Sequence, residues 1–376
     1  MKGKLLQISN DFADQKIYIN LVRNVSKYGI DQIVYVPLKW EHKIDWNRDA
    51  SIENVQYYYS YILRRNPFFR LRYFNKIRLV TKDIEEKIDL SHVSLVHAHF
   101  LFSDGGVAYN LKLKYGIPYV VSVRASDIFT FFGKMVHLRN FGNKIMQEAG
   151  KVIFINHSYV NILQKNYLRN FNKNEIGEKI TVIPNAIEGK WFRNNLKPTK
   201  SHSPFRLLYV GRIVKRKKLD SVVKALEELS KDTDSEYFLD VVGQGEFLSD
   251  VQKAPPKNIE FHGKINDFET LVEIYSKCHV FVMPSVKETF GLVYIESLSQ
   301  GLPIVYCKNE GVDGYFETGE VGVAVTPNSI KEILDAIKYI KTNYERLSKN
   351  ALAASKKFTW DESTKSYISI YKGAVH

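Results

Sequence analysis

Cysteines and long apolar runs are scarce in this chain, and each absence narrows its class. Among 376 residues there are two cysteines, Cys278 and Cys307, in no CxxC motif or metal-ligand spacing. A disulfide framework is therefore not expected, and both thiols are predicted to lie in the core. No apolar run of about eighteen residues occurs, so no membrane-spanning helix is expected. The opening MKGKLLQISN is too polar for a secretory signal, which favours a cytoplasmic protein.

Acidic residues are also scarce, but only in the first half of the chain. Residues 1–190 carry 28 lysines and arginines against 17 acids, whereas residues 191–376 carry 26 against 24. The segment 57–82 contains no acidic residue and interleaves basic side chains with aromatic ones. Such a segment suits a membrane face, a nucleic-acid groove, or a pair of amphipathic helices whose aromatics pack inward. We favour an anionic membrane surface and expect no nucleic acid, because no nucleic-acid module accompanies the segment. Its predicted membrane-facing residues are Arg64, Arg65, Arg70 and Arg72.

Apolar, strand-like runs alternate with helical patterns in both halves. The runs are continuous, as expected for parallel strands that are covered on both faces. Together with the length of 376 residues, this pattern predicts an α/β fold of two doubly wound, Rossmann-like domains. We expect domains at 1–190 and 205–355, a polar linker at 191–204 and a C-terminal helix within 356–376. The predicted strands are 4–8, 32–36, 94–98, 118–123, 151–155, 179–183, 206–210, 237–242, 258–261, 279–283, 303–306 and 321–325.

Two glutamates around the start of one predicted helix are the most informative feature. Glu288 and Glu296 lie in MPSVKETFGLVYIESLSQGLPIVY, residues 283–306. Helical periodicity over 290–299 places Glu288 in the preceding turn and Glu296 on the helix. The free amides and positive dipole at a helix start suit an anion. Because the glutamates would repel a bare phosphate, we interpret them as acceptors for hydroxyl groups on either side of it, as in a nucleotide sugar. The alternative is a capped helix with two solvated glutamates. The amides belong to Phe290, Gly291 and Leu292.

A basic loop opens the second half. Gly211 ends the predicted strand 206–210, and Arg212 and Lys217 lie in the loop before the next helical pattern. The order strand, glycine, basic loop, helix is typical of phosphate sites in parallel sheets. Arg212 offers a planar fork and Lys217 a mobile point charge, which together could neutralise a leaving diphosphate without a divalent ion. The alternative is a solvated basic loop.

Four motifs follow one another in the second half, at 211–217, 242–245, 261–263 and 288–303. They are a Gly-Arg loop with a following Lys, a Val-Gly-x-Gly turn, a Phe-x-Gly loop and a Glu-x7-Glu segment before a Gly-x-Pro strand. In this order they resemble the motifs of the retaining glycosyltransferases of the GT-B class called family 4. The likeness covers most of the chain, and it implies a GT-B fold with the donor sugar bound by the second domain.

The resemblance also implies roles for individual residues. Arg212 and Lys217 would hold the donor diphosphate, Glu288 would contact the transferred sugar, and Glu296 would accept from the ribose hydroxyls. The amides of residues 290–292 would meet the distal phosphate and the sugar, and the loop from Gly263 would frame the base. The remaining residues implied in donor binding are Gly211, Gly243, Gly263, Lys264 and Ile265.

The first half resembles the acceptor domain of the same family, with two departures. The stretch VVSVRASDI has Arg124 where the family often has histidine, and Phe12-Ala13 stand where many members have two glycines. Arg124 cannot act as a base near neutral pH, but it could bind a phosphate or a sugar hydroxyl. We expect one of His97 and His99 to face the cleft and the other the core, and we assign acceptor binding to His99 and Arg124.

The implied reaction is transfer of a hexose-type sugar from a nucleoside diphosphate, with UDP favoured, to a hydroxyl of a glycan or lipid-linked glycan. The anomeric configuration would be retained, and the leaving oxygen would take the acceptor's proton. Asp127 is the alternative proton acceptor, or else a helix cap. The single Asp-x-Asp sequence, residues 232–234, lies in a polar loop, so neither an essential metal nor a cofactor is expected.

Surface polysaccharide synthesis at the inner face of a bacterial membrane is the setting we expect, with the protein bound peripherally. The C-terminal segment 358–372 resembles the helix that the family sends back to the first domain, a candidate hinge. Two other classes compete with the transferase. A sugar-nucleotide epimerase would share the architecture but needs acid and base residues that the sequence does not offer. A basic nucleic-acid-binding protein would explain the charge but not the two glutamates.

Overall fold

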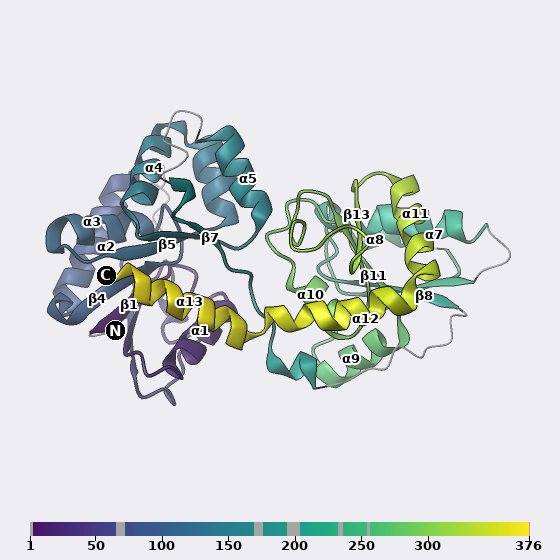
Figure 1. The fold of residues 1–376 in the computed structure, drawn as a ribbon, viewed down its shortest axis with the longest axis horizontal. Coiled ribbons are helices and arrows are strands. Elements are labelled where there is room, and N and C mark those ends of the chain that lie inside the picture. Colours follow the sequence, from purple (N-terminus) through teal and green to yellow (C-terminus); the bar gives the residue numbers. More distant parts are fainter. Residues whose placement is uncertain are drawn as a thin grey trace. The chain divides into compact units, whose positions relative to one another are not determined.

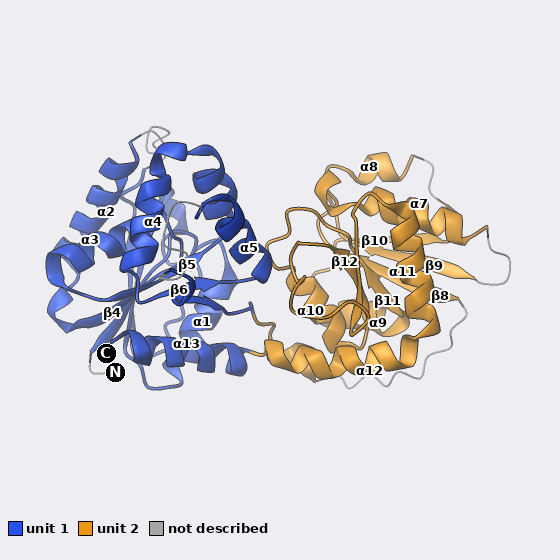
Figure 2. Cartoon of the chain, turned by 45° about the horizontal axis from the view of Figure 1, so that its top comes forward, with its two compact units in different colours: residues 1–185, 360–376 blue, residues 186–359 orange. Residues whose placement is uncertain are grey.

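The computed structural model divides into two compact units. It describes residues 3–64, 72–168, 176–193, 204–231, 236–253 and 256–375. Unit 1 comprises residues 1–185 and 360–376, and unit 2 comprises residues 186–359 (Figure 2). The predicted linker 191–204 is wrong at its start, because Trp191 is buried in the core of unit 2, and its residues 194–203 lie outside the described ranges. The Asp-x-Asp sequence at 232–234 also lies outside the described ranges.

Unit 1 is built on a seven-stranded parallel sheet in the order β3-β2-β1-β4-β5-β6-β7 (Figure 1). Its strands are continuous apolar runs, as strands buried on both faces require. They are β1 (Lys4–Ile8), β2 (Gln32–Pro37), β3 (Val55–Ser60), β4 (Val93–Ala98), β5 (Tyr119–Val123), β6 (Lys151–Phe154) and β7 (Ile180–Val182). Its helices of eight or more residues are α1 (Lys16–Ser26), α2 (Tyr73–Lys87), α3 (Gly105–Tyr115), α4 (Arg139–Glu148), α5 (His157–Asn166) and α13 (Trp360–Ala374).

Unit 2 holds a six-stranded parallel sheet in the order β10-β9-β8-β11-β12-β13. Its strands are β8 (Phe205–Val210), β9 (Tyr237–Val242), β10 (Ile259–Gly263), β11 (Val280–Val282), β12 (Ile304–Cys307) and β13 (Gly322–Val325). Its helices are α7 (Leu219–Leu229), α8 (Leu248–Val251), α9 (Phe268–Lys277), α10 (Leu292–Ser299), α11 (Ile330–Thr342) and α12 (Tyr344–Ser355). The strand order reverses at β8, and ligands of such sheets bind outside the carboxyl ends of the strands at that point.

The predicted strands are confirmed as elements, with small differences at their ends, but one strand was missed. β3 spans Val55–Ser60 and overlaps the start of the segment 57–82, which was predicted as a membrane face, a nucleic-acid groove or a pair of helices. The helix-pair alternative is therefore wrong for the first part of that segment, and α2 begins only at Tyr73. Tyrosines are common in strands, so the run at 57–59 was a strand signal that its basic neighbours concealed.

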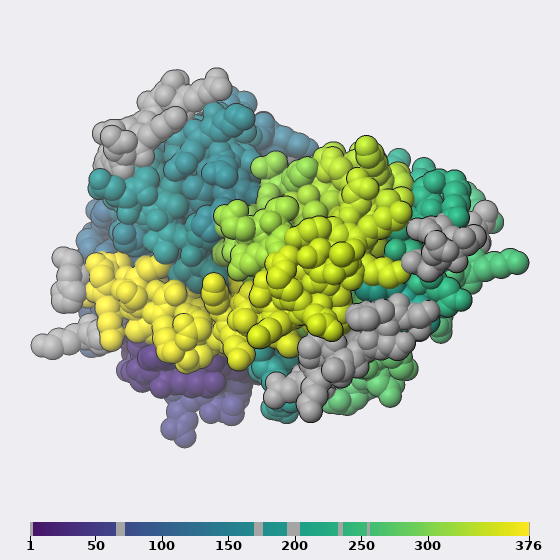
Figure 3. Space-filling model, turned by 45° about the vertical axis from the view of Figure 1, so that its right-hand side comes forward, coloured from purple at the N-terminus to yellow at the C-terminus, as the bar shows by residue number. Residues whose placement is uncertain are grey.

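The C-terminal helix α13 belongs to unit 1, where it packs against α1. In Figure 3 the yellow end of the chain borders the purple N-terminal residues. The buried face of α13 contributes Tyr367 and Tyr371 to a core cluster with Leu5 and Leu21. Within the described ranges, none of the helices combines the length and the apolar character that crossing a membrane requires.

Candidate active site

Three glycines meet at the carboxyl edge of the sheet in unit 2. Gly211 follows β8, Gly243 follows β9 and Gly263 ends β10. The Gly211 amide donates to Val242, and the Gly243 amide donates to Gly263 at 2.7 Å. Gly243 has φ 143°, and a Cβ there would lie 1.9 Å from the Gly211 carbonyl oxygen. Since no side chain fits, this close approach of backbones explains why the motif needs glycine.

A buried ion pair stands beside these loops. The Lys217 ammonium lies 2.5 Å from a carboxylate oxygen of Glu288, and both residues are less than a tenth exposed. The same carboxylate accepts from the Ser285 hydroxyl at 3.1 Å, and the Arg216 guanidinium lies 3.8 Å away. The picture of Lys217 as a mobile point charge is therefore wrong: the side chain is fixed by its partner. The structure joins two motifs that lie 71 positions apart in the chain.

Arg212 differs from Lys217 in its surroundings. Its side chain is exposed, and the neighbouring Ile213 and Val214 are buried. The Ile213 amide donates to Gln244 at 2.9 Å, which fixes the backbone on which Arg212 stands. The loop thus carries the exposed Arg212 guanidinium on a hydrogen-bonded stretch of backbone, five residues before the buried Lys217 ammonium.

The mouth of α10 presents free backbone donors. The helix begins at Leu292 rather than at Phe290, because Gly291 adopts a left-handed conformation with φ 76°. Across the described residues, the backbone N–H groups of 290–292 donate no hydrogen bond. Gly291 lies next to Glu288, since a Cβ built on it would be 3.2 Å from Glu288 Cγ. Free amides at a helix start, with the Lys217 ammonium paired to the nearby Glu288, are the elements of an anion site.

Glu296 lies on α10 and is partly buried. Burial raises the pKa of its carboxyl to about 7, and the nearby Glu188 adds to this effect while Lys190 opposes it. The side chain therefore changes its charge close to neutral pH. Glu188 directly precedes the short helical turn Gly189–Phe192 and Lys190 lies within it; this turn was not predicted as an element.

The remaining predicted donor residues follow β10. Lys264 is exposed, and Ile265 is partly buried against the core of unit 2. One contact at this edge was missed by sequence reasoning: a carboxylate oxygen of Glu310 accepts from the Glu288 amide at 3.1 Å. Glu310 belongs to the loop after β12, and no local pattern connects it with Glu288.

His97 of β4 and His99, just after its end, do not face different sides as predicted. Residues two apart on a strand share a face, and both rings are buried, with centroids 4.0 Å apart. His97 Nδ1 lies 2.7 Å from Tyr371 Oη, and His99 Nε2 lies 2.8 Å from Gln7 Oε1. Burial lowers the pKa of His97 to about 3, so the imidazole stays neutral. His99 Nδ1 has no partner among the described residues.

Asp127 has a structural position, which corrects its assignment as a proton acceptor. Its side chain is fully buried, and its carboxylate accepts backbone N–H groups of Leu101, Phe102 and Arg124 at 2.9–3.1 Å. Burial raises its pKa to about 6, although these amides oppose the shift. Arg124 is also mostly buried, and its Nε donates to the His99 carbonyl at 3.3 Å. The alternative role of Asp127 as a helix cap does not describe these contacts either, because all three amides belong to residues that precede Asp127; the carboxylate instead holds two loops together.

The other sequence predictions in unit 1 have mixed outcomes. Arg64 and Arg72 are exposed, whereas Arg65 and Arg70 lie outside the described residues. Phe12 is buried and packs against the ring of Tyr57, so the loop after β1 is filled by a side chain where the family has glycines. Both cysteines are buried, as predicted.

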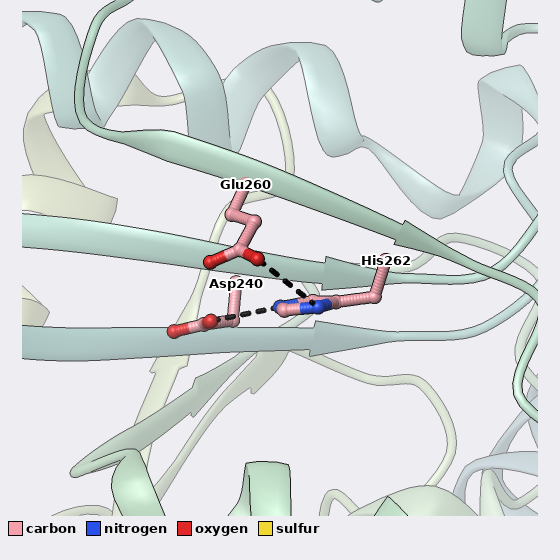
Figure 4. A group of neighbouring side chains, drawn as sticks. All are labelled: Asp240, Glu260 and His262. Carbon is pink, nitrogen blue, oxygen red and sulfur yellow. Dashed lines mark hydrogen bonds and ion pairs between the residues drawn. The ribbon is translucent and has the colours of Figure 1, made fainter.

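One group of metal-ligand residue types occurs in the described part of unit 2. Asp240, Glu260 and His262 bring their side chains together on β9 and β10 (Figure 4). His262 Nε2 lies 2.9 Å from Asp240, and Glu260 lies 3.6 Å from the other ring nitrogen. Arg206 already pairs with both oxygens of Asp240, at 2.7 and 2.9 Å. A guanidinium so close opposes a second cation, so we interpret the group as an ion-pair network.

Comparison with known proteins decides the family. Residues 192–357 match the family described as glycosyl transferases group 1, and residues 18–189 match glycosyltransferase family 4. The chain belongs to this family. The predicted family is thus confirmed, and the chain is a glycosyltransferase of the GT-B, group 1 kind.

Relatives of this glycosyltransferase include enzymes of glycolipid and polysaccharide synthesis. Alpha-monoglucosyldiacylglycerol synthase of Acholeplasma laidlawii is 26% identical, over 94% of this chain and 91% of its own length. The lipopolysaccharide outer core galactosyltransferase WaaB has TM-score 0.75 at 14% identity, covering 98% of this chain and 99% of its own. Anabaena HepE in complex with UDP has TM-score 0.71 at 16% identity, with the same coverage. These likenesses in structure confirm the predicted fold of two Rossmann-like domains.

Proposed function

We propose that this glycosyltransferase moves a hexose-type sugar, with retention, from a nucleoside diphosphate sugar to a hydroxyl of a glycan or lipid-linked glycan. The observation that carries the proposal is the Lys217–Glu288 pair beside the free amides at the mouth of α10. An ammonium and oriented amides stabilise a leaving diphosphate, and a carboxylate next to them accepts from sugar hydroxyls. UDP is the favoured nucleotide, since a relative of the same fold binds it.

A further donor group supports a phosphate at this edge. One terminal nitrogen of Arg216 is buried and has no hydrogen-bond partner within the described part of the chain, although it lies 3.8 Å from Glu288. A buried donor without a partner costs free energy, about 1–3 kcal/mol, which a phosphate oxygen would recover. In the proposed reaction the bond from the anomeric carbon to the diphosphate breaks while the bond to the acceptor oxygen forms on the same face. The acceptor's proton passes to the leaving oxygen, so the protein supplies no nucleophile and needs no metal.

Thermal unfolding in the presence of a chelator tests the donor site. UDP and UDP-sugars should raise the unfolding midpoint with EDTA present, and more than GDP- or ADP-sugars do, because only the native state binds the ligand. Release of UDP with formation of a retained glycoside, followed by NMR of the anomeric proton, tests the reaction. Absence of stabilisation by every nucleotide sugar would count against the transferase proposal, and inversion of the product would count against retention.

The pKa of Glu296 predicts a pH-dependent affinity for UDP. If ribose hydroxyls donate to this carboxylate, UDP prefers the ionised form, so affinity should fall as pH drops below about 7. The loss should approach tenfold per pH unit and should level off above neutrality. Calorimetry at several pH values measures it, and Glu296→Gln is the control because the terminal phosphate of UDP titrates as well. An equal pH dependence in the two proteins would exclude the ribose contact.

Peripheral association with the inner face of a bacterial membrane remains a proposal for this chain. It is supported by the exposed Arg64 and Arg72 and by Phe74, whose side chain is 48% exposed. Basic groups near an anionic surface each contribute about 1 kcal/mol, so Arg64→Glu with Arg72→Glu should reduce sedimentation with phosphatidylglycerol vesicles tenfold or more. Sedimentation that is unchanged by both substitutions would remove this role. Vesicles of phosphatidylcholine alone provide the comparison.

A further inference from the structure

A cluster of polar side chains in unit 1 has no role in the fold as described. The strand order β3-β2-β1-β4-β5-β6-β7 has its switch point between β1 and β4, where the chain leaves in opposite directions. Three buried polar atoms near these two strand ends have no partner among the described residues. They are Ser9 Oγ, His99 Nδ1 and Asp104 Oδ2. Unpartnered polar atoms in the interior cost free energy, so their concentration at one sheet edge indicates a ligand site.

Asp104 is the centre of the cluster. It directly precedes α3 and is 1% exposed, and its Oδ1 accepts from the Asn10 side-chain amide at 3.4 Å. Lys76 of α2 acts electrostatically on both Asp104 and Asp11, and its ammonium lies 3.5 Å from Ser103 Oγ. Burial lowers the pKa of the Lys76 ammonium, while Asp104 and Asp11 oppose that shift. Asp104 therefore lies behind Asn10 and Lys76, which are partly exposed, as is Asp11.

The segment after β2, which carries two exposed aromatic side chains, lies beside this cluster. Asn47 donates to the carbonyls of Phe12 and Ala13 at 2.9 and 3.0 Å, so the segment after β2 is tied to the loop after β1. Lys39 of this segment acts electrostatically on Asp11. Trp40, the next residue, is 37% exposed, and Trp46 is 47% exposed. Large exposed rings next to hydrogen-bonding groups are typical of ligand sites.

The charges of the cluster select the class of ligand. Both lysines of the cluster, Lys39 and Lys76, lie within electrostatic range of a carboxyl group of Asp11 or Asp104, so the cluster is not the purely cationic surface that a phosphate prefers. Carboxylates accept hydrogen bonds and an ammonium donates them, and a sugar hydroxyl does both. A sugar ring also has a face of C–H bonds that can lie on an indole. These features favour a neutral polyhydroxylated ligand over a phosphate-bearing or purely aliphatic alcohol.

We propose that Asn10, Asp11 and Lys76 bind the hydroxyl groups of a saccharide acceptor, and that Asp104 is the positioning residue that holds Asn10 and Lys76. This inference rests on the proposed function and makes it more specific, because it assigns the acceptor to saccharides and names residues for them. Phe12 and Ala13 fill the space that paired glycines would leave at this loop. The loop after β1 therefore offers its polar side chains to the acceptor.

The test measures UDP release from UDP-glucose and UDP-galactose by the full chain, with and without methyl glycosides of glucose, galactose, mannose and N-acetylglucosamine. Glycosides should accelerate release by the unchanged protein, whereas glycerol 1-phosphate and butanol should not. Asp11→Asn and Lys76→Gln should raise the half-saturating glycoside concentration by about tenfold to a hundredfold, with UDP affinity unchanged. Lys76→Arg should recover most of the loss. Asp104→Asn should have a smaller effect in the same direction, and none when Lys76 is already replaced.

Matched controls are Asp31→Asn and Lys114→Gln, which change exposed charges of the same unit away from this cluster. Saturation-transfer NMR with the methyl glycosides measures acceptor binding without any donor, and the unfolding midpoint detects damage to the fold. If the protein releases UDP but glycosides neither accelerate release nor bind, the inference is overturned and the transferase proposal survives. Stimulation by glycerol 1-phosphate alone also overturns it. Glycoside binding without UDP release keeps this site and removes the proposed function.

Discussion

Replacement of Lys217 by methionine should reduce the rate of sugar transfer by about a hundredfold to a thousandfold. The ammonium is placed to neutralise the departing diphosphate, and removing one preorganised donor of this kind costs about 2.7–4 kcal/mol in the transition state. Its ion pair with Glu288, at 2.5 Å, keeps the ammonium in position before the donor binds. The measurement is kcat for release of UDP from the donor sugar that gives the largest thermal stabilisation.

The same substitution should also destabilise unit 2, and a second variant separates the two effects. Lys217→Met leaves the buried Glu288 carboxylate without its main partner, a loss that costs up to about 3–5 kcal/mol. Ser285 and Arg216 remain near the carboxylate and reduce that cost. Adding Glu288→Gln removes the unpaired charge, so the double variant should regain stability in urea unfolding while transfer stays low. A Lys217→Met enzyme that is fully active would exclude the leaving-group role.

Arg212→Ala should reduce transfer about a hundredfold and leave stability nearly unchanged. Arg212 is exposed, and its side chain has no hydrogen bond or ion pair to the described residues, so its removal should change the free energy of unfolding by less than about 0.5 kcal/mol. A guanidinium can bind two phosphate oxygens at once, and this bidentate contact would be lost. The transfer rate of Arg212→Lys should lie between those of the unchanged protein and Arg212→Ala, since lysine keeps the charge but not the planar fork of the guanidinium. Steady-state kinetics with the UDP-sugar measures all three proteins.

Lys215→Ala provides the matched control for Arg212. Lys215 is an exposed cation of the same loop, and its loss changes the net charge of the loop by the same amount. If Arg212 binds the diphosphate directly, Lys215→Ala should retain nearly full activity. Equal losses in the two variants would show that general electrostatic attraction, rather than a specific contact, draws the donor to this edge.

The largest differences between expectation and structure concern side chains rather than elements. The strands and the glycines that follow them could be predicted, because buried strands require continuous apolar runs and a close backbone contact such as that of Gly243 with Gly211 requires glycine. The buried faces of His97 and His99 and the three amides held by Asp127 could not be predicted, because they depend on α13 and on the loop after β4. Asp104 was missed for the same reason: its neighbours Asn10 and Lys76 come from two other elements.

The sequence by itself determined the two-domain α/β fold, the glycines that end its strands and the two glutamates around one helix start, and its motifs carried the resemblance to family 4 that implied a glycosyltransferase. The fold could be predicted because local backbone needs and apolar periodicity act over a few residues. Only the tertiary structure decided which charges pair, since Lys217 meets Glu288 across the edge of a sheet and Asp127 is taken up by backbone amides. Pairing and burial depend on segments far apart in the chain, and they determine which of the candidate groups are available for chemistry.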